Sequence, residues 1–338
     1  MKNLHDKKII LVFFLILVVS TLFISLEFFK ANTKTDVGEY DNAIKFSYEE
    51  DRNIWSENVD NLGSQKAYSK FKTEYAFADF DTQHNVAHIM GELLYEKEGL
   101  NGLAVCDESF AFGCYHSFFI KAMADQGVGV VKDLDEICIT EYPGNATGCQ
   151  HGIGHGILIS LGHQNLVEAL EVCKLTFQPD PLFGCTAGVF MEYNYPVVFS
   201  PGVAKTTLRK IDPNNYNFPC NTIVPSEFRS SCYFEITAYW VQIFNNDFKK
   251  IGRLCQELNA SIEKEACYLG VGSIAVSKNN YKKDAVFLWC GDTKEEKYKS
   301  ICKIGGAWRF YAYGEKEIAR QICAGIDAKF TELICFPE

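Results

Sequence analysis

Apolar residues recur along this chain with helical spacing, in short segments that alternate with polar loops. One kind of segment ends on a cysteine, as in 167–173, 251–255 and 318–323, and its apolar positions predict the last turns of a helix. A second kind starts on a cysteine and carries glycine early, as in 185–191 and 267–272. This second kind predicts the start of another helix. We therefore expect an all-α protein built from two-helix hairpins, each with a helix A and a helix B.

The cysteines divide into seven successive pairs, and the members of each of the last five pairs are twelve positions apart. Most first cysteines follow one another at steps of about 35 residues, a period that is typical of αα-hairpin repeats. The pairs are Cys106 with Cys114, Cys138 with Cys149, Cys173 with Cys185, Cys220 with Cys232, Cys255 with Cys267, Cys290 with Cys302 and Cys323 with Cys335. Such hairpins could stack as an open solenoid or close into an α/α toroid, and the pattern leaves both open.

Each pair would link the end of helix A to the start of helix B across a polar loop. A disulfide that closes a loop of this length stabilises a fold by about 3 kcal/mol in the chain-entropy model. The alternative is that the cysteines bind zinc, but zinc sites usually include a close C-x-x-C pair, and this chain has none. The pattern therefore favours one disulfide per repeat, which indicates an oxidising compartment.

Two regions depart from the regular repeat. Residues 62–97 predict a repeat without cysteines, with helix A at 68–77 and helix B at 84–94. An insertion at 195–219, rich in proline, asparagine and tyrosine, predicts a long irregular loop. In the regular repeats, the glycine near the start of helix B favours backbone-close packing against a neighbouring helix.

The paired cysteines across residues 100–335 resemble the Sel1-like, cysteine-rich helical repeats of secreted bacterial proteins. The resemblance is one of architecture, and it implies a disulfide that clips each two-helix unit. The wider Cys–Cys spacing and the Gly-x-x-Gly character of helix B depart from that pattern. Glycine and histidine at the start of helix B also resemble the inner helices of closed α/α toroids such as the lanthionine-synthetase cyclases. The zinc ligands of those enzymes cannot be placed on this chain, so no functional residue is carried over from either group.

The N-terminus predicts a membrane anchor. Residues 9–26 form a largely apolar run without a charged residue, and three lysines precede it. The length of this run is near the lower limit for a membrane-spanning helix. No small-x-small cleavage site follows, which favours an uncleaved signal-anchor over a cleaved signal peptide. The preceding positive charge predicts a cytoplasmic N-terminus and an extracytoplasmic main domain. The expected organisation is a tip and anchor at 1–30, a linker at 31–60 and the repeat domain at 61–338.

Histidines gather in one part of the repeat domain, where five of them occupy equivalent places near the start of successive B helices. These five are His84, His88, His116, His151 and His155. They include two pairs with i, i+4 spacing, which places both imidazoles of a pair on one helix face, where they can chelate a metal. Further candidate ligands, or a catalytic base, are Glu92, His163, Glu192 and Glu235. Imidazoles with a carboxylate suit Zn, Cu or Fe(II), held in one site or in two.

Other chemistries lack their motifs in this chain. The net charge of −10, with no basic block beyond the N-terminal tip, argues against nucleic acid as a partner. There is no H-E-x-x-H motif, no C-x-x-C-H motif for covalent haem and no Gly-x-Ser-x-Gly elbow. Gly270-Val271-Gly272 lies in a helical repeat and not after a strand, so it does not indicate a nucleotide site.

Three functions fit these observations. The first is a membrane-anchored, extracytoplasmic helical-repeat protein that binds a transition metal through the histidines. The second is the same scaffold as a protein- or glycan-binding module with structural histidines, because helical repeats present extended surfaces. The third is a metal-dependent enzyme with Glu92 or Glu192 as its base.

Overall fold

The computed structural model describes residues 47–143, 146–177, 182–198, 209–279, 282–326 and 335. The chain divides into residues 1–45 and 46–338, and everything described here belongs to the second unit. The described residues form helices and turns, and no strand occurs among them. None of their helices is both long and apolar enough to cross a membrane. The expected tip and anchor at 1–30 lie outside the described residues.

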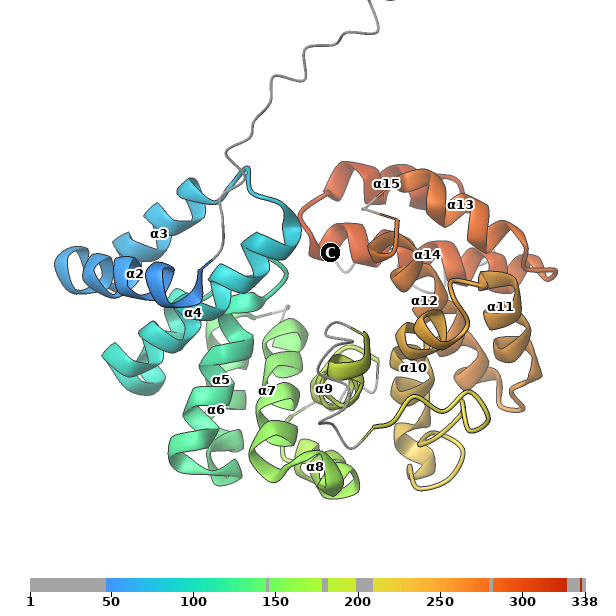
Figure 1. The fold of residues 1–338 in the computed structure, drawn as a ribbon, viewed down its shortest axis with the longest axis horizontal. Helices are drawn as coiled ribbons and strands as arrows, with labels where there is room; N and C mark the ends of the chain where they lie inside the picture. Colours follow the sequence, from blue (N-terminus) through green and yellow to red (C-terminus); the bar gives the residue numbers. More distant parts are fainter. Residues whose placement is uncertain are drawn as a thin grey trace, which may run out of the picture. The chain divides into compact units, whose positions relative to one another are not determined.

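Within the described part of the chain, seven helices form a continuous row (Figure 1). They are α4 (Phe80–Glu98), α5 (Gly113–Gln126), α7 (Ala146–Leu161), α9 (Cys185–Val198), α10 (Arg229–Ile243), α12 (Ser261–Ser277) and α14 (Glu296–Ala312). Each of them packs against the next one along the chain. These seven correspond to the B helices that the sequence predicts.

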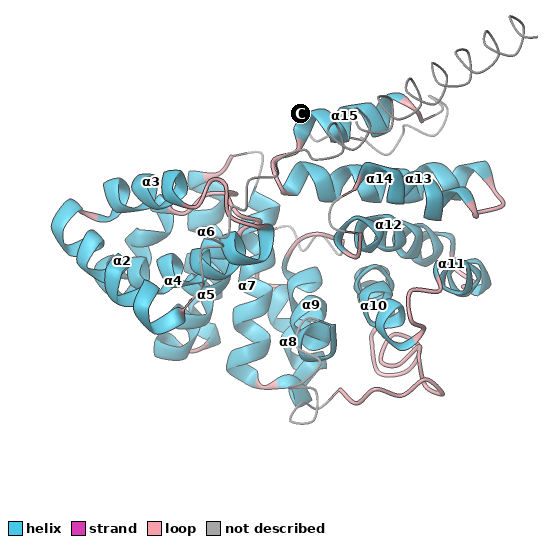
Figure 2. Ribbon diagram, turned by 45° about the horizontal axis from the view of Figure 1, so that its top comes forward, coloured by secondary structure: helices cyan, strands magenta, loops and turns pink. Residues whose placement is uncertain are grey.

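Other helices, most of them shorter, pack on the B helices. They are α2 (Tyr48–Leu62), α3 (Ser64–Glu74), α6 (Val131–Glu141), α8 (Leu166–Cys173), α11 (Phe248–Glu257), α13 (Lys283–Gly291) and α15 (Lys316–Ala324). Helices α6, α8, α11 and α13 each contact the B helix that follows them, as helix A of a hairpin should. A long loop leads into α10 through the 3₁₀ turn η5 (Ser226–Phe228) (Figure 2).

All fourteen cysteines form disulfides, in the seven pairs that the sequence predicts. The bonds join Cys106 to Cys114, Cys138 to Cys149, Cys173 to Cys185, Cys220 to Cys232, Cys255 to Cys267, Cys290 to Cys302 and Cys323 to Cys335. A sulfur in a disulfide is not a thiolate ligand, so the pairing excludes the alternative in which these cysteines bind zinc. Seven disulfides also indicate an oxidising environment.

Most of the disulfides clip a hairpin in the expected way. Cys173 at the end of α8 is bonded to Cys185 at the start of α9, and the bonds at α6–α7, α11–α12 and α13–α14 have the same arrangement. Before α5, a 3₁₀ helix, η1 (Gly99–Val105), takes the place of helix A. Cys106, directly after η1, is bonded to Cys114 in the first turn of α5.

The other two disulfides use a sulfur from outside the helices. Cys232 in the first turn of α10 is bonded to Cys220 in the long loop that precedes this helix. Cys323 near the end of α15 is bonded to Cys335, which lies in a bend. Both bonds therefore tie a non-helical segment to a helix, α10 in the first case and α15 in the second.

Glycine lets consecutive B helices approach closely. A Cβ atom on Gly188 would lie 1.9 Å from the carbonyl oxygen of His151, and one on Gly305 would lie 2.0 Å from the carbonyl oxygen of Leu269. Both glycines are the third residue after the second cysteine of their pair, and both face the preceding B helix. A side chain larger than hydrogen cannot fit at these crossings. The close packing that the sequence predicts is therefore confirmed.

The N-terminal part of the described chain differs from its expected organisation. Residues 48–60, part of the expected linker, are helical in α2, which packs on α3 and α4. Trp55 is fully buried there, and its ring meets that of Phe71 edge-on, with 5.2 Å between the ring centroids. Charged residues dominate the segment's composition, but the apolar side chains that recur every fourth residue, at Trp55 and Val59, give this helix a face to bury. Of the expected insertion at 195–219, residues 199–208 lie outside the described residues.

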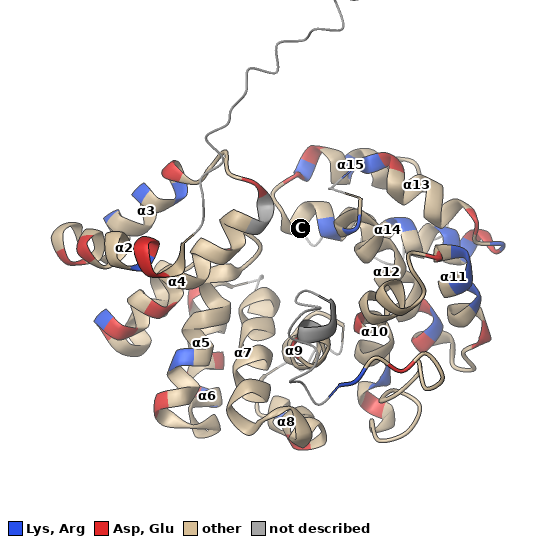
Figure 3. Cartoon of the chain, viewed as in Figure 1, with Lys and Arg blue, Asp and Glu red and all other residues tan. Residues whose placement is uncertain are grey.

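Charged side chains are scarce in the middle of the B-helix row (Figure 3). Helix α7 has no Lys, Arg, Asp or Glu, and Glu192 is the only such residue of α9. Residues on these helices therefore lie in an apolar environment, in which a polar side chain needs a specific partner.

Candidate metal centre

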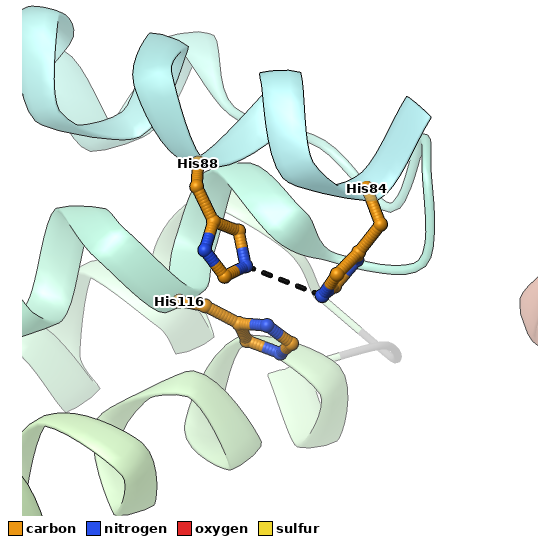
Figure 4. Close-up of side chains that lie close together, drawn as sticks. All are labelled: His84, His88 and His116. Carbon is orange, nitrogen blue, oxygen red and sulfur yellow. Dashed lines mark hydrogen bonds between the residues drawn. The ribbon is translucent and has the colours of Figure 1, made fainter. Parts of the chain in front are cut away.

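Helix α4 presents two imidazoles on one face. His84 and His88 are one helical turn apart, and their Nε2 atoms lie 3.2 Å from each other (Figure 4). The Nδ1 atom of His84 is 2.9 Å from the carbonyl oxygen of Phe110. Because a carbonyl oxygen can only accept, Nδ1 of His84 carries the proton and its Nε2 presents a lone pair. That lone pair points at His88, into the space between the two rings.

Helix α7 repeats this arrangement with His151 and His155. Their Nε2 atoms are also 3.2 Å apart. The Nδ1 atom of His155 donates to Oε2 of Glu192, 2.9 Å away on α9, which leaves the Nε2 atom of His155 facing His151. In the neutral ring, that Nε2 atom carries the lone pair. His151 hydrogen-bonds the backbone of Phe183. Both pairs therefore hold a nitrogen lone pair inward while an outer partner fixes the ring.

His116 on α5 lies between the two pairs, because α5 packs between α4 and α7. Its ring centroid is 5.1 Å from that of His84 and 4.5 Å from that of His155. Two groups of possible ligand atoms result, and within each group all atoms lie within 4.8 Å of one another: His84, His88 and His116, and His116, His151 and His155. The sequence left one site or two open, and the structure joins the five histidines into one cluster through His116.

Burial keeps three of the five imidazoles neutral. It is the largest cause, ahead of the neighbouring imidazoles, that holds the pKa values of His88, His116 and His151 well below the ordinary value of 6.5. At neutral pH these rings are therefore unprotonated, which is the form that binds a metal.

Glu192 is a carboxylate in direct contact with the cluster. Burial raises the pKa of Glu192, but the hydrogen bond with His155 and the nearby imidazole of His163 outweigh that effect and lower it to about 2. The Oε1 atom of Glu192 is 3.7 Å from Nε2 of His163, and this contact raises the pKa of His163. Glu192 therefore stays ionised and orients His155 from outside the cluster, as carboxylates commonly do for metal-ligating histidines.

The other candidate ligands lie elsewhere. Glu92 follows His84 by eight residues, which turns it about 80° around the helix; it accepts a hydrogen bond from Tyr48 and lies near Arg52 on α2. His163 comes after the end of α7, in the 3₁₀ turn η3 (His163–Asn165), on the far side of Glu192. Glu235 is buried on α10, and neither possible ligand group includes it.

The sequence did not predict the backbone turn that orients His84. Phe110, Ala111 and Phe112 all have left-handed φ angles, of 54°, 54° and 64°. This turn between η1 and α5 brings the carbonyl oxygen of Phe110 to His84. Phenylalanine and alanine rarely adopt such angles, so nothing in the local sequence indicates the turn. Strained backbone of this kind tends to occur at functional sites.

The geometry suits a small transition metal. A tetrahedral zinc ion with Zn–N bonds of about 2.0–2.1 Å holds its nitrogen ligands about 3.3 Å apart. The Nε2 atoms of each i, i+4 pair are 3.2 Å apart, close to that separation. Each group supplies three nitrogen ligands, and imidazole nitrogen is a good ligand for Zn, Cu and Fe alike. The buried histidine groups could therefore hold a metal ion.

Comparison with known proteins adds no assignment: no family model, curated protein or solved structure matches this chain.

Proposed function

We propose that this protein is a membrane-anchored, extracytoplasmic helical-repeat protein that binds a transition metal through His84, His88, His116, His151 and His155. The observation that supports metal binding is the inward lone pair of each i, i+4 pair. In each pair, an acceptor outside the cluster fixes the proton on Nδ1 of one ring and leaves its Nε2 atom facing the other ring. A metal between the rings would use both nitrogens.

The location of the protein is argued from its disulfides and its N-terminus. Seven disulfides in one domain are expected of a protein that folds outside the cytoplasm. The apolar run at 9–26, with lysines before it, would then anchor the domain in the membrane. The regular hairpins and the equivalent glycine crossings support a repeat of about 35 residues, which is typical of αα-hairpin repeats.

The cluster favours metal binding over acid–base catalysis by its carboxylates. A general base works best when its pKa is near the working pH, whereas that of Glu192 is about 2. Glu92 is engaged by Tyr48 and Arg52. The third function, an enzyme that uses either carboxylate as its base, has less support than storage, transfer or structural use of a metal.

The test is the metal content of residues 31–338, produced in an oxidising compartment and measured by mass spectrometry. We expect stoichiometric metal in the wild-type protein and after reloading with Zn(II). A variant with His84, His88, His151 and His155 all changed to Gln should lose it, with circular dichroism confirming that the helices remain. Glu92→Gln is the matched control and should keep its metal. Folded wild-type protein that takes up neither Zn(II), Cu(II) nor Fe(II) would overturn the proposal.

A further inference from the structure

His116 belongs to both groups of possible ligands, and this raises the question of how many metals the cluster can hold. Without His116, each i, i+4 pair supplies two nitrogens, from His84 and His88 or from His151 and His155. A typical zinc or copper site in a protein has at least three protein ligands. Both groups can be complete at the same time only if His116 gives Nδ1 to one metal and Nε2 to the other.

The surroundings of His116 allow it to use both nitrogens. His84, His151 and His155 each make a hydrogen bond with a group outside the cluster. Within the described part of the chain, neither ring nitrogen of His116 has a hydrogen-bond partner, although its side chain is buried. Both ring nitrogens are therefore available to a ligand.

The ring of His116 also lies in the middle of the cluster. The centroid of His116 lies 5.1 Å and 5.5 Å from those of His84 and His88 on α4. It lies 5.9 Å and 4.5 Å from those of His151 and His155 on α7. The ring therefore lies at similar distances from both pairs, one pair on either side of α5.

We propose that the fully loaded cluster holds two divalent transition-metal ions bridged by the imidazole ring of His116. His84 and His88 complete the ligands of one ion, and His151 and His155 complete those of the other. This inference rests on the proposed metal-binding function and adds the number of metals and the role of one residue. No other histidine belongs to both groups of possible ligands found among the described residues.

Binding of the second ion requires one proton to leave. The first ion bonds to the lone pair of one nitrogen of His116 and leaves the N–H of the other intact. When the second ion arrives, that N–H bond breaks, a metal–nitrogen bond forms with the electron pair, and the proton passes to water. The ring becomes an imidazolate, and its negative charge, with that of Glu192 beside His155, partly balances the two cations.

Copper(II) provides the test, because two copper ions bridged by one imidazolate are magnetically coupled. We expect residues 31–338 to bind two Cu(II) per chain, with an electron paramagnetic resonance signal well below that of two isolated ions. The double variant His84→Gln/His88→Gln should bind one Cu(II) with an ordinary mononuclear signal, because the α7 group keeps His116. His151→Gln/His155→Gln should behave in the same way from the other side.

The variant His116→Gln separates the bridge from the rest of the cluster. It should abolish the coupled signal and lower the copper content below two per chain, with helicity and disulfides intact. Wild-type protein that binds one Cu(II), or two with full uncoupled signal, overturns the bridge and leaves the proposed metal binding in place. Folded protein that binds no Cu(II), Zn(II) or Fe(II) overturns both.

Discussion

At the scale of the residue, the cluster is organised by its outer hydrogen bonds as much as by its histidines. Glu192 accepts from His155, and the carbonyl oxygen of Phe110 accepts from His84, so each ring is held in one tautomer with its other nitrogen turned inward. These partners lie on different segments, α9 and the turn before α5. An imidazole that is already oriented loses less conformational freedom when it binds a metal.

Removing the charge of Glu192 should weaken metal binding while leaving the five imidazoles in place. We expect Glu192→Gln to lower zinc affinity by about tenfold, and Glu192→Ala by up to about a hundredfold, because His155 loses its ionised partner. Competition with a chelator of known affinity measures the change. Glu168→Gln, at an exposed carboxylate of α8, is the matched control. Equal affinity in all four proteins would show that the carboxylate does not act on the site.

Glu235 should make stability fall as pH rises. Burial raises the pKa of Glu235 to about 8 from its ordinary value of 4.5, so between these values the folded protein holds a proton that the unfolded chain has lost. Stability is then fully present below the unfolded pKa and declines through this window, by up to about 1.4 kcal/mol per pH unit. Glu235→Gln should remove that decline.

Denaturant unfolding at pH 5, 6, 7 and 8 compares the variant with the wild-type protein. The stability advantage of Glu235→Gln should grow with each pH step. Glu257→Gln, at an exposed position of α11, is the control and should leave the pH profile of the wild type unchanged. A constant difference across the four pH values would contradict the prediction.

At the scale of the element, glycine crossings set the distance between the B helices. Gly188 on α9 faces the carbonyl oxygen of His151 on α7, so the crossing lies directly behind one of the clustered histidines. Gly154 on α7 meets the carbonyl oxygen of Cys185 in the opposite direction, 2.0 Å from where its Cβ would be. The two helices are thus locked at close range where His155 must reach Glu192.

Replacing Gly188 by alanine should force α7 and α9 apart. The Cβ atom would lie 1.9 Å from a backbone oxygen that cannot rotate away, and overpacking of this kind costs about 1–3 kcal/mol or more. Gly252→Ala is the matched control, because this helical glycine of α11 has no heavy atom within 4 Å of the added Cβ. There, better helix propensity should stabilise by about 0.5–1 kcal/mol. Chemical denaturation measures both, and equal effects of the same sign would contradict the argument.

At the scale of the whole unit, the candidate metal centre is built from four B helices in sequence order. His84, His116, His151 and Glu192 come from α4, α5, α7 and α9, which pack one against the next. The disulfides at the starts of α5, α7 and α9 clip these helices to the segments before them, so each one holds its part of the site in register. Short helices of this kind are marginal in isolation, so a disulfide at the start of a B helix adds stability that the helix alone does not have.

The repeating local signals in the chain are enough to predict its seven B helices and its disulfides, but not α2, which lies in the expected linker. Cysteines twelve residues apart lie at the end of helix A and the start of helix B. These two helix ends are close because the short loop between them turns back, so the spacing predicts a disulfide. The recurring glycine indicated close contacts between helices. Glycine lowers helix propensity, so its repeated use near the start of helix B suggests positions where a larger side chain cannot fit. Periodicity also placed the i, i+4 histidine pairs on single helix faces.

Only the tertiary structure decided which of the candidate residues meet. Local sequence could not show that His116 lies between the two pairs, because its position depends on how tightly α4, α5 and α7 pack. Glu92 and Glu192 are equally good candidates in the sequence. In the structure, Glu92 faces α2 and accepts from Tyr48, whereas Glu192 on α9 accepts from His155. The turn at Phe110 is held in a conformation that its own residues disfavour. The sequence determined the repeated helices, the disulfide pairs and the spacing of the histidines. Long-range packing determined which imidazoles lie close together, because those contacts are made between neighbouring helices and not between residues that are close in the sequence.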